Sequence, residues 1–300
     1  MDIIGKKWLY FLFSGLIILP GLISLALWGV RPAIDFSGGT LIEVQSPRFK
    51  VQSEKDELKK IIEAQKIEIG SITHSGDDSY LLRLKPIDKS QNDKLQEEMV
   101  KQFGEIKEIR FETVGPSIGR ETTENAIKAV IVASVAIILY IAFAFRTVPK
   151  PYSSLKFGIC AVMALIHDVL VIVGLFSLFG HYFKVEIDSL FITALLTIMG
   201  FSVHDTIVVF DRIRENLKKM PNSSFATVVN ESIIQTLARS LSTTLTVLFT
   251  LLALFLFGGE SIRWFVVALL IGITSGTYSS IFNAAPLLVV WEEKTHRKSI

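Results

Sequence analysis

The sequence predicts a membrane α-helical bundle of six transmembrane helices, with one α+β ferredoxin-like domain between helices one and two. Half of the 300 residues are hydrophobic and the mean hydropathy is +0.47, a composition typical of membrane proteins. Six apolar runs approach the roughly 20 helical residues that a hydrocarbon core requires. A polar stretch separates the first two runs, and short strand and helix patterns alternate within it.

Six apolar segments give the expected membrane helices. The first follows Lys6 and Lys7, as the apolar region of a secretory signal peptide would. It is too long for such a region, and residues 26–28 at its end form a poor cleavage site, so we expect an uncleaved anchor. The segments are Trp8–Trp28, Ala126–Phe145, Phe157–Phe179, Ile187–Phe210, Ser240–Phe257 and Trp264–Val290.

Basic residues are unevenly distributed among the short connections, and this predicts the orientation. Cytoplasmic loops of membrane proteins carry an excess of Lys and Arg. We therefore expect a cytoplasmic N-terminus and the first helix in residues 1–30, the other five helices in 125–291, and a cytoplasmic tail in 292–300. The basic connections follow the second and fourth segments and contain Arg146, Lys150, Lys156, Arg212, Arg214, Lys218 and Lys219.

Residues 31–124 are expected on the extracytoplasmic side, as one small domain. The pattern gives the order β-α-β-β-α-β, which is that of a ferredoxin-like sandwich. Ser53 is a plausible helix N-cap, and 75-SGDD-78 reads as a turn between two strands. The predicted strands and helices are Thr40–Gln45, Ser53–Gln65, Ile69–His74, Tyr80–Leu84, Ser90–Phe103 and Ile106–Val114.

Several function classes find no support in the sequence. A P-loop, an H-E-x-x-H pair and a G-x-S-x-G elbow are all missing, so we expect neither an enzyme nor a cofactor. The single cysteine, Cys160, excludes a disulfide framework or a thiolate metal site. The net charge of +2 is too small to indicate nucleic-acid binding.

Asp168, Asp205 and Arg239 stand out among the ionisable residues near predicted membrane depth. A charge there costs roughly 2.5–3.5 kcal/mol on insertion scales, so each residue is a functional hypothesis by default. At 1.5 Å of rise per residue, Asp205 and Arg239 each lie roughly 27 Å from the outer ends of their helices. We therefore expect these two side chains to face each other and to carry ion coupling, with Asp168 extending the site.

Every residue of this candidate site also has a structural interpretation. Arg239 can extend its side chain to the lipid headgroups, and Asp168 can form a hydrogen bond that fixes helix packing. Hydroxyl groups in a membrane helix can hold water, or they can bond back to their own backbone. Accessory residues of an expected polar track are His167, His204, Ser242 and Thr243.

Four motifs together resemble the SecF family, the smaller half of the SecD–SecF complex of the bacterial protein-export machinery, within the resistance-nodulation-division superfamily. They are 35-DFSGGT-40, 114-VGPSIGRE-121, 200-GFSVHDTIVVFDRIREN-216 and 239-RSLSTT-244. The resemblance covers essentially the whole chain. It implies a subunit of the inner membrane that spans the lipid bilayer and pairs with SecD. The same resemblance implies association with the SecYEG channel and a role in preprotein export that uses the proton-motive force.

The resemblance also implies roles for single residues. Asp205 and Arg239 occupy the positions of the family's ion-coupling residues. The family commonly has asparagine immediately before the aspartate, whereas this chain has His204, which leaves open whether the ion is a proton or sodium. Two other interpretations stay open: a scaffold that stabilises SecD and the channel, and half of a small-molecule or lipid exporter.

Overall fold

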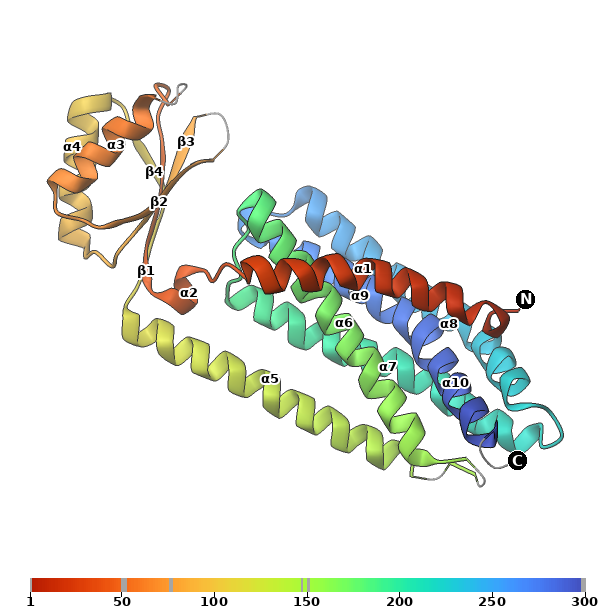
Figure 1. Ribbon diagram of the computed structural model, residues 1–300. Helices are drawn as coiled ribbons and strands as arrows, with labels where there is room; N and C mark the ends of the chain where they lie inside the picture. Colours follow the sequence, from red (N-terminus) through yellow and green to blue (C-terminus); the bar gives the residue numbers. More distant parts are fainter. Residues whose placement is uncertain (1, 50–52, 76–77, 147, 150–151, 298–300) are drawn as a thin grey trace. The chain divides into compact units, whose positions relative to one another are not determined.

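The computed structural model describes residues 2–49, 53–75, 78–146, 148–149 and 152–297, in two compact units (Figure 1). Unit 1 is Met1–Arg31 with Lys128–Ile300, and unit 2 is Pro32–Ile127. Unit 1 is helical and unit 2 contains the sheet. The chain therefore passes between the units twice, and the second passage lies within a single long helix.

Six candidate membrane spans match the six predicted segments. The fourth and fifth helices are longer than predicted, because α7 continues to Lys219 and α8 begins at Phe225. The Ser224 side chain accepts a hydrogen bond from the Thr227 backbone N–H and so caps α8. The helices of the spans are α1 (Lys7–Trp28), α5 (Pro116–Ala144), α6 (Ser154–Phe183), α7 (Ser189–Lys219), α8 (Phe225–Phe257), α9 (Arg263–Ser279) and α10 (Ala285–Arg297).

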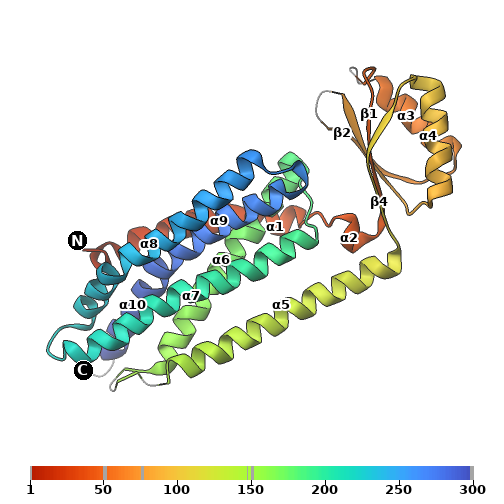
Figure 2. The same cartoon turned by 180° about the vertical axis from the view of Figure 1, so that it is seen from behind.

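A π-helical turn, Ser280–Ala284, joins α9 to α10 within the sixth span. Figure 2 shows α7, α8 and α9 side by side in unit 1. Glycine permits a close approach between α7 and α9, since a Cβ atom on Gly276 would lie 3.0 Å from Cβ of Ser202. Small residues of this kind let membrane helices pack closely.

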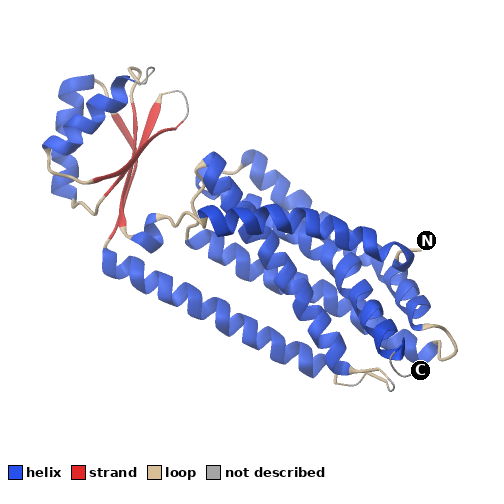
Figure 3. Cartoon of the chain, in the orientation of Figure 1, coloured by secondary structure: helices blue, strands red, loops and turns tan. Residues whose placement is uncertain are grey.

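Unit 2 has the predicted order of strands and helices, preceded by the short helix α2 (Ile34–Ser37). The antiparallel sheet has the strand order β2-β3-β1-β4, and Figure 3 shows both longer helices on one face of it. The predicted cap by the Ser53 side chain and residues 76–77 of the predicted turn fall outside the described residues. The elements are β1 (Gly39–Gln45), α3 (Ser53–Ala64), β2 (Ile69–Ser75), β3 (Ser79–Leu84), α4 (Lys89–Phe103) and β4 (Lys107–Val114).

The core of unit 2 lies between the sheet and its two helices. Alternate strand residues such as Ile42, Val44 and Leu82 are fully buried and pack against Leu58 of α3 and Leu95 of α4. This is the period-2 pattern that a sheet with one covered face requires. The polar stretch between the first two spans therefore has its own hydrophobic core.

Candidate functional site

Asp168 of α6 lies at the centre of a buried hydroxyl cluster in unit 1. Its side chain is 0% exposed, and hydroxyl groups of Ser202, Ser275 and Ser279 donate hydrogen bonds to it at 2.5, 2.9 and 2.6 Å. Nδ1 of His167 lies 3.0 Å from Oδ1 of the same carboxylate. Each oxygen thus has two polar neighbours, which compensate a buried negative charge.

The donors come from three helices, and the helical repeat explains the arrangement. Ser275 and Ser279 are four residues apart on α9 and therefore lie on one face of that helix. Ser202 approaches from α7, and this approach is possible because Gly276 of α9 has no side chain to separate the two helices. The Asp168 cluster consequently joins α6, α7 and α9 through a single carboxylate.

Asp205 of α7 is also buried, at 2% exposure, but it has fewer partners than Asp168. The hydroxyl of Thr277 donates to its Oδ2 at 2.9 Å, and this hydroxyl is also 2.7 Å from Oγ1 of Thr244 on α8. The other oxygen, Oδ1, lies 3.7 Å from Nδ1 of His204, which is beyond hydrogen-bond distance. Within the described part of the chain, Oδ1 thus accepts no hydrogen bond, and it can accept a proton or coordinate a cation.

Hydroxyl groups connect the surroundings of the two carboxylates. Thr206 Oγ1 donates to the Ser202 backbone carbonyl at 3.1 Å and lies 2.8 Å from Oγ of Ser280. Ser280 in turn donates to the Gly276 carbonyl at 2.8 Å. The residues from Ser275 to Ser280 thus contact both carboxylate environments, and the π-helical turn begins at the end of this run.

The predicted contact between Asp205 and Arg239 is absent from the ion pairs of the described residues. Asp205 is directed toward α9, whereas the Arg239 side chain is exposed on α8. Thr236, Ser240 and Thr244 form the buried face of α8, and Arg239 is about 100° away from Ser240 around the helix axis. Equal depth in the membrane therefore does not bring these two side chains together in this structure.

The predicted polar track is also arranged differently. Ser242 and Thr243 are exposed, and the Thr243 hydroxyl donates to the Arg239 backbone carbonyl at 3.0 Å. Ser240 is buried instead, and its hydroxyl has no hydrogen-bond partner among the described residues. Nε2 of His167 is likewise buried without a partner there. The hydroxyls that face the bundle interior are therefore one or two positions away from those predicted.

Sequence reasoning missed the hydroxyl residues of α9 and Ser202 of α7. The small residues of α9 are typical of helix packing, and this property hid the second role of Ser275 and Ser279 as hydrogen-bond donors. The signal that could have found them was their four-residue spacing, which places two hydroxyls on one face of an apolar helix. A buried aspartate on another helix makes such a face necessary.

The exposed face of α7 is unusually polar for a membrane-spanning helix. Thr193, Thr197, Gly200 and His204 recur at helical spacing and are all exposed, with the His204 side chain at 67%. Polar side chains within a membrane span normally face protein or water. This α7 face, together with exposed Arg239 on α8, therefore has the chemistry of a surface that contacts another protein.

Charged residues near the end of α7 form ion pairs with one another. Asp211 forms an ion pair with Arg214, and Arg212 contacts Glu215 at 2.6 Å.

The described residues contain no group of three or more His, Cys, Asp or Glu that could hold a metal ion. The chemistry of unit 1 is therefore concentrated at the Asp168 and Asp205 clusters.

Six apolar helices, with two buried carboxylates among them, define a multi-pass membrane protein. The chain belongs to the SecD/SecF family, because the family described as "Protein export membrane protein SecD/SecF, C-terminal" matches residues 94–294. A protein translocase subunit SecF from Thermobaculum terrenum is 48% identical, over 98% of this chain and 95% of the relative. A second SecF, from Anaerolinea thermophila, is 44% identical over 97% and 94% of the two chains.

Longer relatives match this chain over only part of their own length. A protein translocase subunit SecDF from Bacillus subtilis is 34% identical over 99% of this chain, which spans only 39% of that relative. The crystal structure of SecDF, a translocon-associated membrane protein from Thermus thermophilus, matches with a TM-score of 0.82 and 34% identity. The match covers 98% of this chain and 39% of the SecDF chain. These names favour protein export over export of small molecules or lipids.

Proposed function

We propose that this protein is an accessory subunit of the Sec translocase that works with SecD in the bacterial inner membrane. It couples proton flow down the membrane gradient to export of preproteins through the SecYEG channel. Family membership supports the export role, and the partly satisfied Asp205 carboxylate supports ion coupling. Asp205 is the single observation that carries the proposal, because a buried acid with a free acceptor oxygen can bind a passing cation.

Binding of a cation at Asp205 changes the α7–α9 contact. A proton on Oδ1 neutralises the carboxylate and so weakens the bond from Thr277, which stabilises the charged form. Thr277 also contacts Thr244, so the change reaches α8. One charge that crosses a 100 mV potential provides about 2.3 kcal/mol, enough to shift a two-state helix arrangement substantially.

SecD is the partner that covers the polar α7 face. In the SecDF relatives one chain contains a match to this protein together with a longer remainder. Exposed His204 and Arg239 would be costly against lipid, whereas a partner subunit can supply hydrogen bonds and an opposite charge. Arg239 accordingly acts at the subunit interface and influences ion coupling from there.

Unit 2 acts on the extracytoplasmic side as a ferredoxin-like domain. The strand order β2-β3-β1-β4 with two helices on one face agrees with that fold, and the basic connections favour cytoplasmic termini. The inner helices transmit their rearrangement to unit 2 through α5 and through residues 31–39. Unit 2 thereby assists the preprotein after it leaves the channel.

The test is preprotein translocation into vesicles that contain the chain, SecD and the channel, with and without an imposed proton gradient. Asp205→Asn should abolish the acceleration by the gradient, while assembly with SecD persists. Asp211→Asn is the matched control, because it removes a carboxylate from an exposed position of the same helix. Equal gradient dependence for Asp205→Asn and the wild type would contradict the coupling role.

A scaffold without ion coupling is the second candidate, and the Asp168 cluster favours it. Four polar neighbours leave that carboxylate without spare acceptor capacity, which is typical of a group that fixes packing. A scaffold predicts that Asp168→Asn reduces the amount of SecD complex and of export together. Under this alternative, the rate per assembled complex would keep its full gradient dependence in every variant.

A further inference from the structure

The edge of the unit 2 sheet offers a free strand. In the order β2-β3-β1-β4, β2 pairs on one side with β3 and has no second partner among the described residues. An edge strand directs a row of backbone N–H and C=O groups outward, which is a template for an added strand. The register shifts between Ile69 and Ser71, whereas residues 71–75 pair regularly with β3. Residues 71–75 therefore form the regular part of this free edge.

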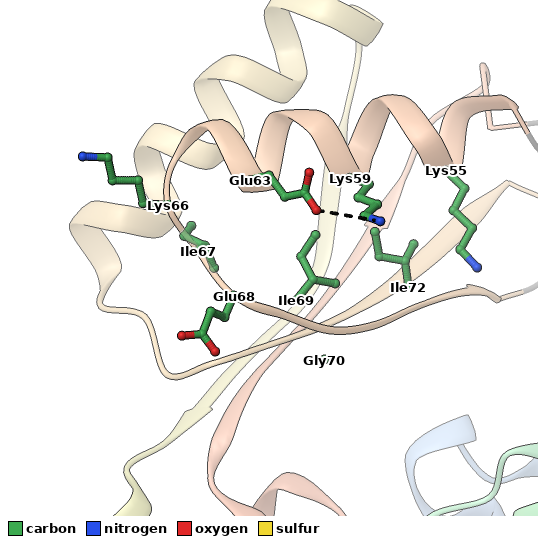
Figure 4. Close-up of a pocket in the computed structure, with 9 residues that line it drawn as sticks. All are labelled: Lys55, Lys59, Glu63, Lys66, Ile67, Glu68, Ile69, Gly70 and Ile72. Carbon is green, nitrogen blue, oxygen red and sulfur yellow. Dashed lines mark ion pairs between the residues drawn. The ribbon is translucent and has the colours of Figure 1, made fainter.

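A cavity of about 650 Å³ lies between this edge and α3 (Figure 4). Ile67, Ile69 and Ile72 form its apolar floor, and they lie between the helix and the strand in the close-up. Ile67 and Ile72 are only 6% and 7% exposed, so they are fixed in the core. Because side chains alternate along a strand, an added strand would direct every second side chain toward this floor.

The rim of the cavity is positively charged. Both glutamates of the rim already have cationic partners. Glu63 pairs with Lys59 at 3.8 Å, and Glu68 pairs with Lys85. The exposed ammonium groups of Lys55 and Lys66 have no ion pair within the described part of the chain. The charged residues that line the cavity are Lys55, Lys59, Glu63, Lys66 and Glu68.

We propose that β2 and this cavity bind an extended segment of the exported polypeptide whose cavity-facing side chains, at every second position, are apolar and acidic. Backbone hydrogen bonds to β2 provide affinity for many sequences, and the isoleucine floor with the lysine rim selects among them. The inference rests on the proposed function, which supplies an unfolded chain on this side of the membrane. Charge complementarity identifies the acidic side chains as the ones that the rim prefers.

Photo-crosslinking in vesicles tests the contact, with the full chain, SecD, the channel and an arrested translocation intermediate. A benzophenone side chain at exposed Thr73 of β2 should cross-link to the arrested polypeptide. The same probe at exposed Lys94 of α4 is the control and should cross-link several-fold less. A cross-link from Thr73 to SecD or to a second copy of the chain instead would overturn the proposal and identify an assembly interface.

Charge reversal tests the preference of the rim. Lys55→Glu with Lys66→Glu should reduce the Thr73 cross-link several-fold when the arrested segment is acidic, and less when it is neutral. Lys60→Glu with Lys89→Glu makes the same charge change at exposed positions outside the cavity lining, and it should leave the cross-link unchanged. An equal effect of both pairs of substitutions would refute selection by the rim.

A third variant separates this inference from ion coupling. In Asp205→Asn vesicles the Thr73 cross-link should persist while the response to the gradient is lost. An unchanged response of Asp205→Asn to the gradient, with the cross-link intact, would count against coupling alone. Normal gradient-driven export by the chain with an unchanged Asp205, but without a Thr73 cross-link, would overturn the peptide site alone.

Discussion

At the scale of single residues, Asp168 and Asp205 have the same chemistry in different surroundings. Hydroxyls of three serines and a histidine nitrogen surround Asp168, whereas one threonine hydroxyl contacts Asp205 within hydrogen-bond distance. A carboxylate stabilised on every side contributes to packing, and one with a free oxygen can exchange a cation. This difference supports the proposal that Asp168 stabilises helix packing and that Asp205 exchanges the cation.

The two aspartates therefore predict opposite outcomes for the same substitution. Asp168→Asn replaces an acceptor oxygen with a donor NH₂ group in a cluster of donors, and should cost about 1–3 kcal/mol of stability. Asp205→Asn can keep the bond from Thr277 and should have a smaller effect. Thermal unfolding of the purified chain in detergent measures both Tm values. A larger loss of Tm for Asp205→Asn would contradict this assignment.

Single residues also mark what the sequence can predict of the site. Asp168 and Asp205 could be found because a carboxylate within an apolar run is visible in the sequence. The lack of an ion pair between Asp205 and Arg239 among the described residues could not be foreseen, because the rotation of α8 about its axis depends on packing against α9 and not on depth. The serines of α9 were hidden for a related reason, since small residues serve packing and hydrogen bonding equally well.

At the scale of elements, the approach of α7 to α9 positions both carboxylate clusters. Gly276 allows Ser202 to reach Asp168 and lies one residue before Thr277, which reaches Asp205. The π-helical turn follows immediately and returns the chain to a regular helix in α10. Turns of this kind are often found at functional sites. The spacing between α7 and α9 is therefore the structural variable that both clusters share.

A substitution at Gly276 should change that spacing. Gly276→Ala places a Cβ atom 3.0 Å from Cβ of Ser202, so we expect a loss of about 1–3 kcal/mol and weaker gradient dependence. Gly15→Ala in α1 is the matched control, because no atom lies within 4 Å of the added Cβ. Tm in detergent and translocation in vesicles report the two effects. Equal Tm values for these variants would disprove the close contact.

The order of elements was more predictable than their ends. All six spans and the β-α-β-β-α-β order followed from hydropathy and alternation, because both patterns are local. The extension of α7 to Lys219 and the start of α8 at Phe225 lie in polar sequence, where burial of residues such as Val228 and Val229 stabilises the helix. A hydropathy pattern does not predict tertiary packing of this kind.

At the scale of the whole molecule, α5 is the continuous connection between the two units. It begins at Pro116 in unit 2 and ends at Ala144 in unit 1, without interruption at the boundary near Lys128. Its most apolar stretch is only 6% buried within the described structure. A helix with so few supporting contacts can transmit displacement only through its own hydrogen bonds. The proposed transmission through α5 therefore depends on the continuity of this helix.

Interruption of α5 should uncouple ion exchange from export. Ala129→Pro, at an exposed position just inside unit 1, removes one helical hydrogen bond and clashes with the preceding turn, a cost of about 3 kcal/mol within the helix. The Asp205 cluster contains no residue of α5, so a pH-sensitive dye in the vesicles should still report proton uptake. Gradient-driven export should fall toward the level of Asp205→Asn. Ala129→Leu keeps the backbone donor and is the control, with export expected near that of the wild type. Full gradient-driven export in the proline variant would mean that residues 31–39 alone transmit the rearrangement to unit 2.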